Sequence, residues 1–89
     1  MRSQRAVGRF RKDLKQARRR GYDLKKLEAV LDLLLAGKPL PAACEDHPLK
    51  GKWQGYRDCH IGPDWLLIYR IDGDELVLVR TGTHADIFG

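Results

Sequence analysis

The stretch Trp65-Leu66-Leu67-Ile68-Tyr69 carries five consecutive large apolar side chains, and it decides the fold class. Successive side chains of a β-strand point to opposite faces of the sheet, so a strand with this sequence is buried on both faces. Such a strand lies inside a sheet that helices cover on one side. We therefore expect a central strand over Trp65–Ile71.

The neighbouring segments supply the rest of the sheet. Gly62-Pro63-Asp64 and Asp72-Gly73-Asp74 have the composition of turns, and each separates two runs rich in β-branched and aromatic residues. Antiparallel strands joined by tight turns are the expected result. We place the other strands at Lys52–Tyr56, Arg57–Ile61 and Glu75–Thr81.

The first forty residues have helical periodicity instead. A first helix is expected over Arg9–Arg20, with an apolar stripe of Phe10, Leu14 and Ala17. A second helix is expected to begin after the N-cap Asp23 and to end at Gly37, with an apolar face of Leu24, Leu27, Val30, Leu31, Leu34 and Leu35. We expect these two helices to pack together as a hairpin.

The order of the elements predicts an α+β fold, in which two N-terminal helices pack on a small antiparallel β-sheet. A chain of 89 residues has room for one core, so residues 1–89 are expected to form a single domain. Arg5-Ala6-Val7 is a candidate for a short edge strand before the first helix.

The net charge of +5 is distributed unevenly along the chain. Residues 1–26 carry eleven Lys and Arg against two acids, whereas residues 27–89 carry six against ten acids. The first part therefore attracts polyanions, and nucleic acid is the expected partner. A membrane surface would attract the same charge, but the apolar stripe of the first helix is too narrow for an interfacial helix, so we expect no membrane partner.

The sequence also predicts a cytoplasmic protein. No apolar run approaches the length of a transmembrane helix, and the basic N-terminal segment is not followed by the apolar part of a signal peptide. Cys44 and Cys59 are too few for a disulfide framework, and we interpret both as packed thiols.

The three histidines all lie in the second half of the chain: His47 in a loop before Pro48, His60 in a strand, and His84 beyond the last strand. RNA is cleaved without a metal when a base removes the 2′-OH proton, an acid protonates the leaving 5′-oxygen and cations stabilise the phosphorane. Imidazole serves as acid or base near neutral pH. The candidates for the supporting roles are Asp64 or Asp58 to orient an imidazole, Arg80 and Arg57 to hold the phosphate, and Trp65 and Phe88 to stack on bases.

Each of these features has a simpler interpretation. A single histidine is more often structural than catalytic, the basic helix face can be merely solvated, and Trp65 heads an apolar strand that belongs partly to the core. Zinc is disfavoured because Cys59 and His60, as adjacent strand residues, point to opposite faces and cannot easily share an ion with Cys44 and His47. We expect no metal and no cofactor.

A dense, ordered set of residues resembles the YafQ branch of the RelE toxin superfamily. The resemblance covers roughly residues 10–89, and it is carried by the segments His47–Gly51, Trp53, Gly55–Asp58, His60-Ile61, Pro63–Tyr69, Arg80–His84 and Phe88-Gly89. It implies a microbial-RNase-like α+β domain that enters the ribosomal A site, cuts the mRNA there and is neutralised by a cognate antitoxin. The first six residues depart from the family, because they lack the alternating apolar residues of a confident first strand.

Carried over position by position, the resemblance implies that the catalytic residues are His47, His60, Asp64 and His84. Trp65 and Phe88 would support the site, and Arg80 would contact a phosphate. We favour His47 as base and His84 as acid, while the reverse assignment stays open.

The resulting hypothesis is a ribosome-dependent, metal-independent endoribonuclease that cleaves mRNA and leaves a 2′,3′-cyclic phosphate. Its expected partners are mRNA, the ribosome and an antitoxin, with ribosomal RNA bound by Arg11, Lys15, Arg18 and Arg19. The alternative is a non-catalytic basic regulator that binds nucleic acid. The intact set of His47, His60, Asp64 and His84 favours the enzyme, since a binding protein has no reason to keep these residues together.

Overall fold

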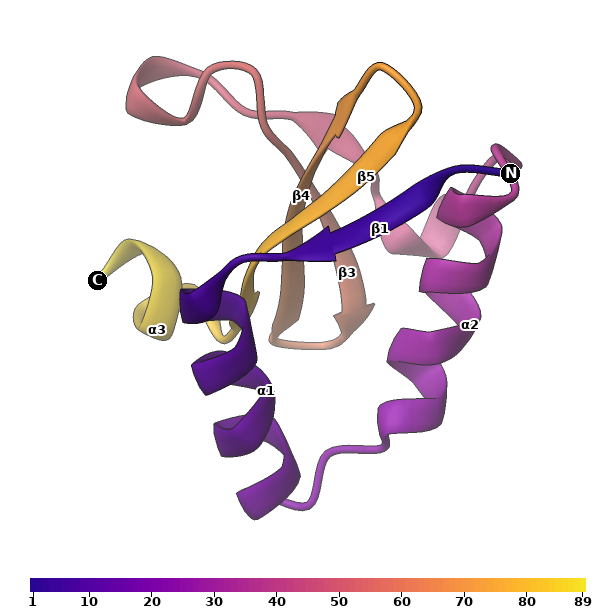
Figure 1. Ribbon diagram of the computed structural model, residues 1–89. Coiled ribbons are helices and arrows are strands. Elements are labelled where there is room, and N and C mark those ends of the chain that lie inside the picture. Colours follow the sequence, from indigo (N-terminus) through magenta and orange to yellow (C-terminus); the bar gives the residue numbers. More distant parts are fainter.

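The computed structural model describes residues 1–89 and contains a five-stranded sheet with two long helices on one face and a short helix at the C-terminal end (Figure 1). The strands follow the spatial order β1-β5-β4-β3-β2. One turn of 3-10 helix lies between the second long helix and the sheet, and another lies between two strands of the sheet. The elements are β1 (Ser3–Ala6), α1 (Gly8–Arg19), α2 (Leu24–Leu35), η1 (Ala42–Cys44), β2 (His47–Pro48), η2 (Gly51–Trp53), β3 (Arg57–Gly62), β4 (Trp65–Asp72), β5 (Glu75–Gly82) and α3 (His84–Phe88).

Strand β4 is the central strand, as its apolar run predicts. All five residues from Trp65 to Tyr69 are buried. The odd-numbered residues Trp65, Leu67 and Tyr69 join the core under the long helices, and Leu66 and Ile68 pack with Ile87 in a second cluster. The strand therefore separates two apolar cores, one on each face of the sheet.

The long helices begin and end close to the expected residues. The Asp23 carboxylate caps α2 by accepting a hydrogen bond from the Lys25 backbone N–H at 3.1 Å. Phe10 of α1 and Leu27, Val30 and Leu34 of α2 contribute to the core that covers the sheet.

The expectation that the helices pack as a hairpin was wrong. Figure 1 shows α1 and α2 joined at one end and splayed apart towards the other, and α1 packs mainly on β5. The physical reason is that the apolar side chains of both helices pack into the core formed with β4 and β5. An apolar groove of about 220 Å³ remains between them, lined in part by Phe10, Leu14, Leu27 and Leu31.

The sheet is mixed, which corrects the expected purely antiparallel sheet. Strand β1 pairs parallel to β5, and the other pairs are antiparallel. The first three side chains of β1 are exposed, and backbone hydrogen bonds such as Ser3 N–H to Asp74 C=O (3.0 Å) and Val7 N–H to Leu78 C=O (3.1 Å) hold this edge in place. An edge strand held in this way needs no apolar alternation.

The expected strand at Lys52–Tyr56 is absent. Gly55, with φ of +93°, adopts a left-handed conformation that does not occur within a strand, and η2 occupies the preceding residues. The fifth strand is instead the two-residue β2, so His47 lies in a strand and not in a loop. His47 pairs with Asp58 and Pro48 with Arg57, and the proline is tolerated because β2 is an edge strand.

Helix α3 is fixed by a reciprocal capping box. The Thr83 hydroxyl accepts a hydrogen bond from the Asp86 N–H at 3.1 Å, and the Asp86 carboxylate accepts one from the Thr83 N–H at 2.9 Å. Gly82 is required beside this cap, because a Cβ atom there would lie 2.8 Å from the Asp86 carboxylate. The turn that follows β5 is thereby rigid, and it sets the position of His84.

Both cysteines are buried free thiols, as expected. Cys59 is fully buried, and burial raises the pKa of its thiol well above the usual range. None of the helices has the length and apolar character that a bilayer-spanning segment requires.

Candidate active site

The three imidazoles converge on the face of the sheet opposite the long helices. His47 lies on β2, His60 on β3 and His84 at the first turn of α3. The ring centroids of His60 and His84 are 5.9 Å apart. Elements distant in sequence thus bring together the three imidazoles that the sequence singled out as candidates.

The His47 ring is held through Nδ1, which lies 2.7 Å from the Glu45 backbone carbonyl oxygen. A carbonyl oxygen only accepts hydrogen bonds, so Nδ1 carries the proton and donates it. The same nitrogen is 3.3 Å from Oδ1 of Asp58. In the neutral ring, Nε2 therefore carries the lone pair, and about half of the side chain is open to solvent.

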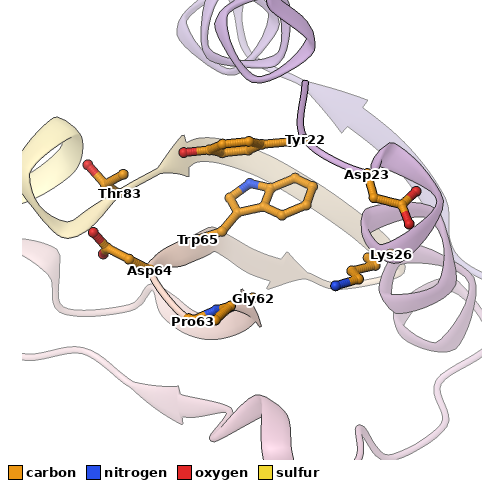
Figure 2. Close-up of a pocket in the computed structure, with 8 residues that line it drawn as sticks. All are labelled: Tyr22, Asp23, Lys26, Gly62, Pro63, Asp64, Trp65 and Thr83. Atoms are coloured by element: carbon orange, nitrogen blue, oxygen red, sulfur yellow. The ribbon is translucent and has the colours of Figure 1, made fainter. Parts of the chain in front are cut away.

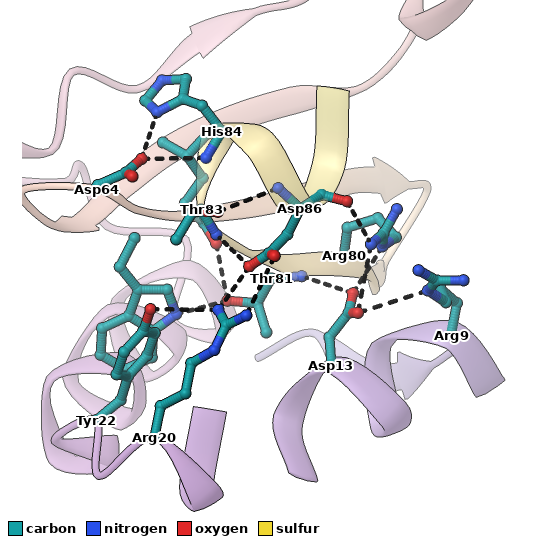
Figure 3. A network of polar contacts seen from close by, with 12 residues as sticks. Arg9, Asp13, Arg20, Tyr22, Asp64, Arg80, Thr81, Thr83, His84 and Asp86 are labelled. Atoms are coloured by element: carbon teal, nitrogen blue, oxygen red, sulfur yellow. Dashed lines mark hydrogen bonds and ion pairs between the residues drawn. The ribbon is translucent and has the colours of Figure 1, made fainter. Parts of the chain in front are cut away.

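The His84 ring is oriented by Asp64 (Figure 3). The Nδ1 atom of His84 is 2.7 Å from Oδ1 of Asp64, and the backbone N–H of His84 donates to the same oxygen at 3.0 Å. These two hydrogen bonds lower the pKa of the Asp64 carboxyl below its usual range. The carboxylate therefore stays charged near neutral pH, and Nε2 of His84 is the ring nitrogen left for a substrate.

The Asp58 carboxylate lies between the histidines and is only 4% exposed. Burial raises the pKa of the Asp58 carboxyl above its usual range, while His47, His60 and His84 act in the opposite direction. Cys59, the residue between Asp58 and His60, belongs to the core under the helices. Strand alternation thus places the carboxylate and the His60 imidazole together on the site face.

An aromatic wall borders the imidazoles. The Phe88 ring, 44% exposed, lies 6.4 Å from the His84 ring and 6.0 Å from the Trp53 ring, measured between centroids. Tyr56 meets Trp53 edge to face at 5.6 Å. Sequence reasoning did not assign Trp53 or Tyr56 to the site, and the strand expected over Lys52–Tyr56, which contains both, does not form.

Trp65 lies on the other side of the sheet from Phe88. Its ring is buried against Tyr22 at 4.8 Å, and its indole N–H donates to the Thr81 hydroxyl at 2.8 Å. Together with Tyr22, Lys26 and Asp64 it lines an open cavity of about 410 Å³ (Figure 2). A base-stacking role for Trp65 stays a prediction, and the described contacts make it a support for the turn that carries Asp64.

Both candidate phosphate-binding arginines are paired with carboxylates. Arg80 is 13% exposed, with its Nε 2.6 Å from Oδ2 of Asp13, and it also donates to the Asp86 carbonyl oxygen at 3.2 Å (Figure 3). Arg57 pairs with Asp46 at 3.2 Å. A phosphate would have to compete with these partners, so the two roles stay predictions.

The outer face of α1 is cationic, as the sequence indicates. Arg9 and Lys12 of this helix are exposed, and Arg9 pairs with Asp13. Four further basic residues are exposed as well, and none of these four takes part in an ion pair. We call them the α1 basic face: Arg11, Lys15, Arg18 and Arg19. The adjacent Arg20 differs, because its guanidinium binds the Asp86 carboxylate at 2.6 Å.

The side chains of this protein form no metal-binding cluster. No group of three or more His, Cys, Asp or Glu side chains is arranged to hold a metal ion. Cys59 and His60 lie on opposite faces of the sheet, as strand alternation requires.

Comparison with known proteins places the chain in a family. The family model described as bacterial toxin of type II toxin-antitoxin system, YafQ, matches residues 2–89. The mRNA interferase toxin YafQ of Escherichia coli strain K12 is 49% identical over 83 residues, which are 92% of this chain and 90% of that protein.

Solved structures agree with this match. A copper-bound mutant toxin from Helicobacter pylori has a TM-score of 0.96 and 39% identity, covering 99% of this chain and all of that one. YafQ in the E. coli DinJ-YafQ complex has a TM-score of 0.92 and 47% identity, with both chains fully covered. The expected α+β fold is thereby confirmed, and the chain belongs to the YafQ family of toxins of type II toxin-antitoxin systems.

Proposed function

We propose that this chain is an endoribonuclease that cleaves mRNA on the ribosome by acid–base catalysis. The observation that carries the proposal is the matched anchoring of two imidazoles. His47 and His84 are each held through Nδ1, by a carbonyl and a carboxylate respectively, which leaves Nε2 of each ring to exchange protons with a substrate. The E. coli K12 relative bears the name mRNA interferase, which supports the same class of reaction.

The reaction consists of two proton transfers and one displacement at phosphorus. Nε2 of His47 takes the proton from the 2′-OH, the 2′-oxygen attacks the phosphorus, and the bond to the 5′-oxygen breaks. Nε2 of His84 donates its proton to that leaving oxygen. The products are a 2′,3′-cyclic phosphate and a free 5′-OH, so neither an oxidant nor a metal is required.

The surroundings of the imidazoles fit a single-stranded substrate. The exposed ring of Phe88, supported by Trp53, presents a surface on which a base can stack beside His84. His60 and Asp64 complete the proposed catalytic set, the latter by fixing the His84 ring. Arg80 and Arg57 are the proposed phosphate contacts, each of which would exchange a carboxylate partner for the substrate.

The α1 basic face is proposed to bind ribosomal RNA. Its cations are exposed and unpaired, and they lie on a helix that takes no part in the imidazole cluster. Phosphate contacts of this kind position a protein without reading sequence. The chain is further proposed to act in the cytoplasm, where its ribosomal target lies, and to be inhibited by its own antitoxin, as the DinJ-YafQ complex suggests.

The test is single-turnover cleavage of mRNA on programmed ribosomes. His47→Ala and His84→Ala are each expected to slow cleavage about 10²- to 10⁴-fold while remaining folded, because each removes a proton-transfer group. Lys38→Ala, an exposed residue beyond α2, is the matched control and is expected to cleave like the native chain.

Two other arms separate the alternatives. EDTA is expected to have no effect, and cleavage that stops with EDTA and returns with zinc or copper would show that the metal-free mechanism is wrong. A native chain that binds ribosomes without cutting mRNA would favour the non-catalytic regulator.

A further inference from the structure

Asp58 is a buried carboxylate whose charge the rest of the fold does not neutralise. The side chain is 6% exposed, and its Oδ1 atom is buried without a hydrogen-bond partner. No lysine or arginine pairs with it, whereas Asp13, the most comparable buried carboxylate, binds Arg80 and the Thr81 N–H. An unpaired buried carboxylate destabilises a protein, so Asp58 is unexplained as a structural residue.

The groups that face Asp58 are the imidazoles. They are His47 from β2, His60 from β3 and His84 from α3, and the Asp46 carboxylate also acts on Asp58, in the opposite direction. His47 is the nearest of them, with Nδ1 at 3.3 Å from Oδ1, and it has the largest electrostatic effect of the three. Since no lysine or arginine pairs with Asp58, the positive charge nearest to its carboxylate is that of a protonated histidine.

His47 and His84 differ in how strongly a nearby carboxylate would stabilise the protonated ring. In neutral His47, the Nδ1 proton is directed at the Glu45 carbonyl 2.7 Å away, and Asp58 is left without a partner. When Nε2 of His47 takes a proton, the ring becomes an imidazolium against a buried anion, where little water screens the attraction. His84 instead pairs with Asp64, which is 61% exposed, so water weakens that attraction.

We propose that Asp58 is the positioning residue of the acid–base pair, acting through His47 by stabilising the imidazolium that forms when His47 takes the 2′-OH proton. This inference rests on the proposed function and deepens it, because it assigns His47 as the base and His84 as the acid. Asp58 itself touches no substrate. The Glu45 carbonyl sets the tautomer of His47, and Asp58 supplies the opposing charge.

The first test is a double-mutant cycle with single-turnover cleavage. Asp58→Asn keeps the size of the side chain and removes its charge, and it is expected to slow cleavage about ten- to hundredfold, the effect of losing an opposite charge within about 4–6 Å. In a His47→Ala background, Asp58→Asn is expected to have no further effect, since the two residues act as a unit. In a His84→Ala background it is expected to keep its full effect.

The pH profile gives a second readout. Asp58→Asn is expected to shift the same limb of the bell-shaped profile that His47→Ala removes, by about one pH unit towards acid, because the imidazolium loses its counter-charge. Asp64→Asn is expected to shift the other limb. Asp72→Asn, which changes an exposed carboxylate at the end of β4, is the matched control and should leave both limbs unchanged.

A third measurement keeps Asp58 in place and needs no activity. In the native chain, NMR titration of the Asp58 carboxyl is expected to give a pKa above the usual range, and His47→Ala should raise this pKa further than His84→Ala does. An unchanged Asp58 titration in His47→Ala, or Asp58→Asn effects that add fully to those of His47→Ala, would overturn the inference. Native cleavage rates in both His47→Ala and His84→Ala would instead overturn the proposed function.

Discussion

Asp13 is predicted to be a main anchor of the fold between α1 and β5. Its carboxylate accepts hydrogen bonds from Nε of Arg80 at 2.6 Å and from the Thr81 N–H at 3.1 Å, and it is 6% exposed. Asp13→Asn keeps an oxygen for Thr81 but removes the charge opposite Arg80. We expect this variant to be much less stable than the native chain.

The magnitude follows from the burial of both partners. Removing one member of a buried ion pair costs about 3–5 kcal/mol, because the remaining charge is left without compensation. Arg80 is 13% exposed and keeps the Asp86 carbonyl oxygen, so the lower end, about 3 kcal/mol, applies. For a domain of this size, that corresponds to a fall in melting temperature of about 12–24 °C.

The assay is thermal and urea unfolding followed by circular dichroism. Asp32→Asn, on the exposed face of α2, is the control and should change stability by less than about 0.5 kcal/mol. The double variant Asp13→Asn/Arg80→Gln should recover part of the loss, since no buried charge remains. A melting temperature within about 2 °C of native for Asp13→Asn, or a double variant no more stable than the single one, would show that the pair is not an anchor.

Three other outcomes are expected. The Arg20 guanidinium holds the pKa of the Asp86 carboxyl well below its usual range. The charged carboxylate therefore stabilises the fold above about pH 4, and this contribution is lost as the pH falls below that value. In Asp86→Ala, the free energy of unfolding should depend less steeply on pH below about 4. Phe88→Ala should slow single-turnover cleavage by about 5- to 150-fold, which corresponds to the loss of about 1–3 kcal/mol of base stacking, with an unchanged melting temperature. Charge reversal of the α1 basic face should reduce the slope of log affinity for ribosomes against log salt concentration, by the amount expected for losing about three or four phosphate contacts. The cleavage rate of the bound protein should change little. An unchanged salt slope would count against the proposed rRNA contact.

The elements that the sequence predicts well are those specified by local pattern. The run Trp65–Tyr69 has no polar face, so only a central strand suits it, and that is where β4 lies. The Asp23 cap likewise depends on neighbours in sequence. In contrast, β1 has no apolar pattern, because backbone hydrogen bonds hold it in the sheet. Backbone groups are the same in any sequence, so they leave no signal from which this strand could be predicted.

The sequence could predict which types of residue form the candidate site, but not which side chains contact one another. The sequence indicated His47, His60 and His84 as candidates, and the fold brings them together. It could not show that Arg80 meets Asp13, because that contact joins residues 67 positions apart. Nor could it single out Asp58, whose significance lies in the partner that its buried oxygen lacks.

The parallel pairing of β1 with β5 has a consequence for how the protein folds. Residues 3–6 must find residues 75–78 before the sheet is complete, and this closure brings α1, with Asp13, against Arg80 and Thr81. Contacts between such distant segments form late and slowly, because a long loop must close before they contribute. Helix α3 is bound to α1 by the Arg20–Asp86 ion pair, so we expect the position of His84 to become fixed together with that closure. Ribonuclease activity and native structure are therefore expected to appear together in refolding experiments, with no active intermediate.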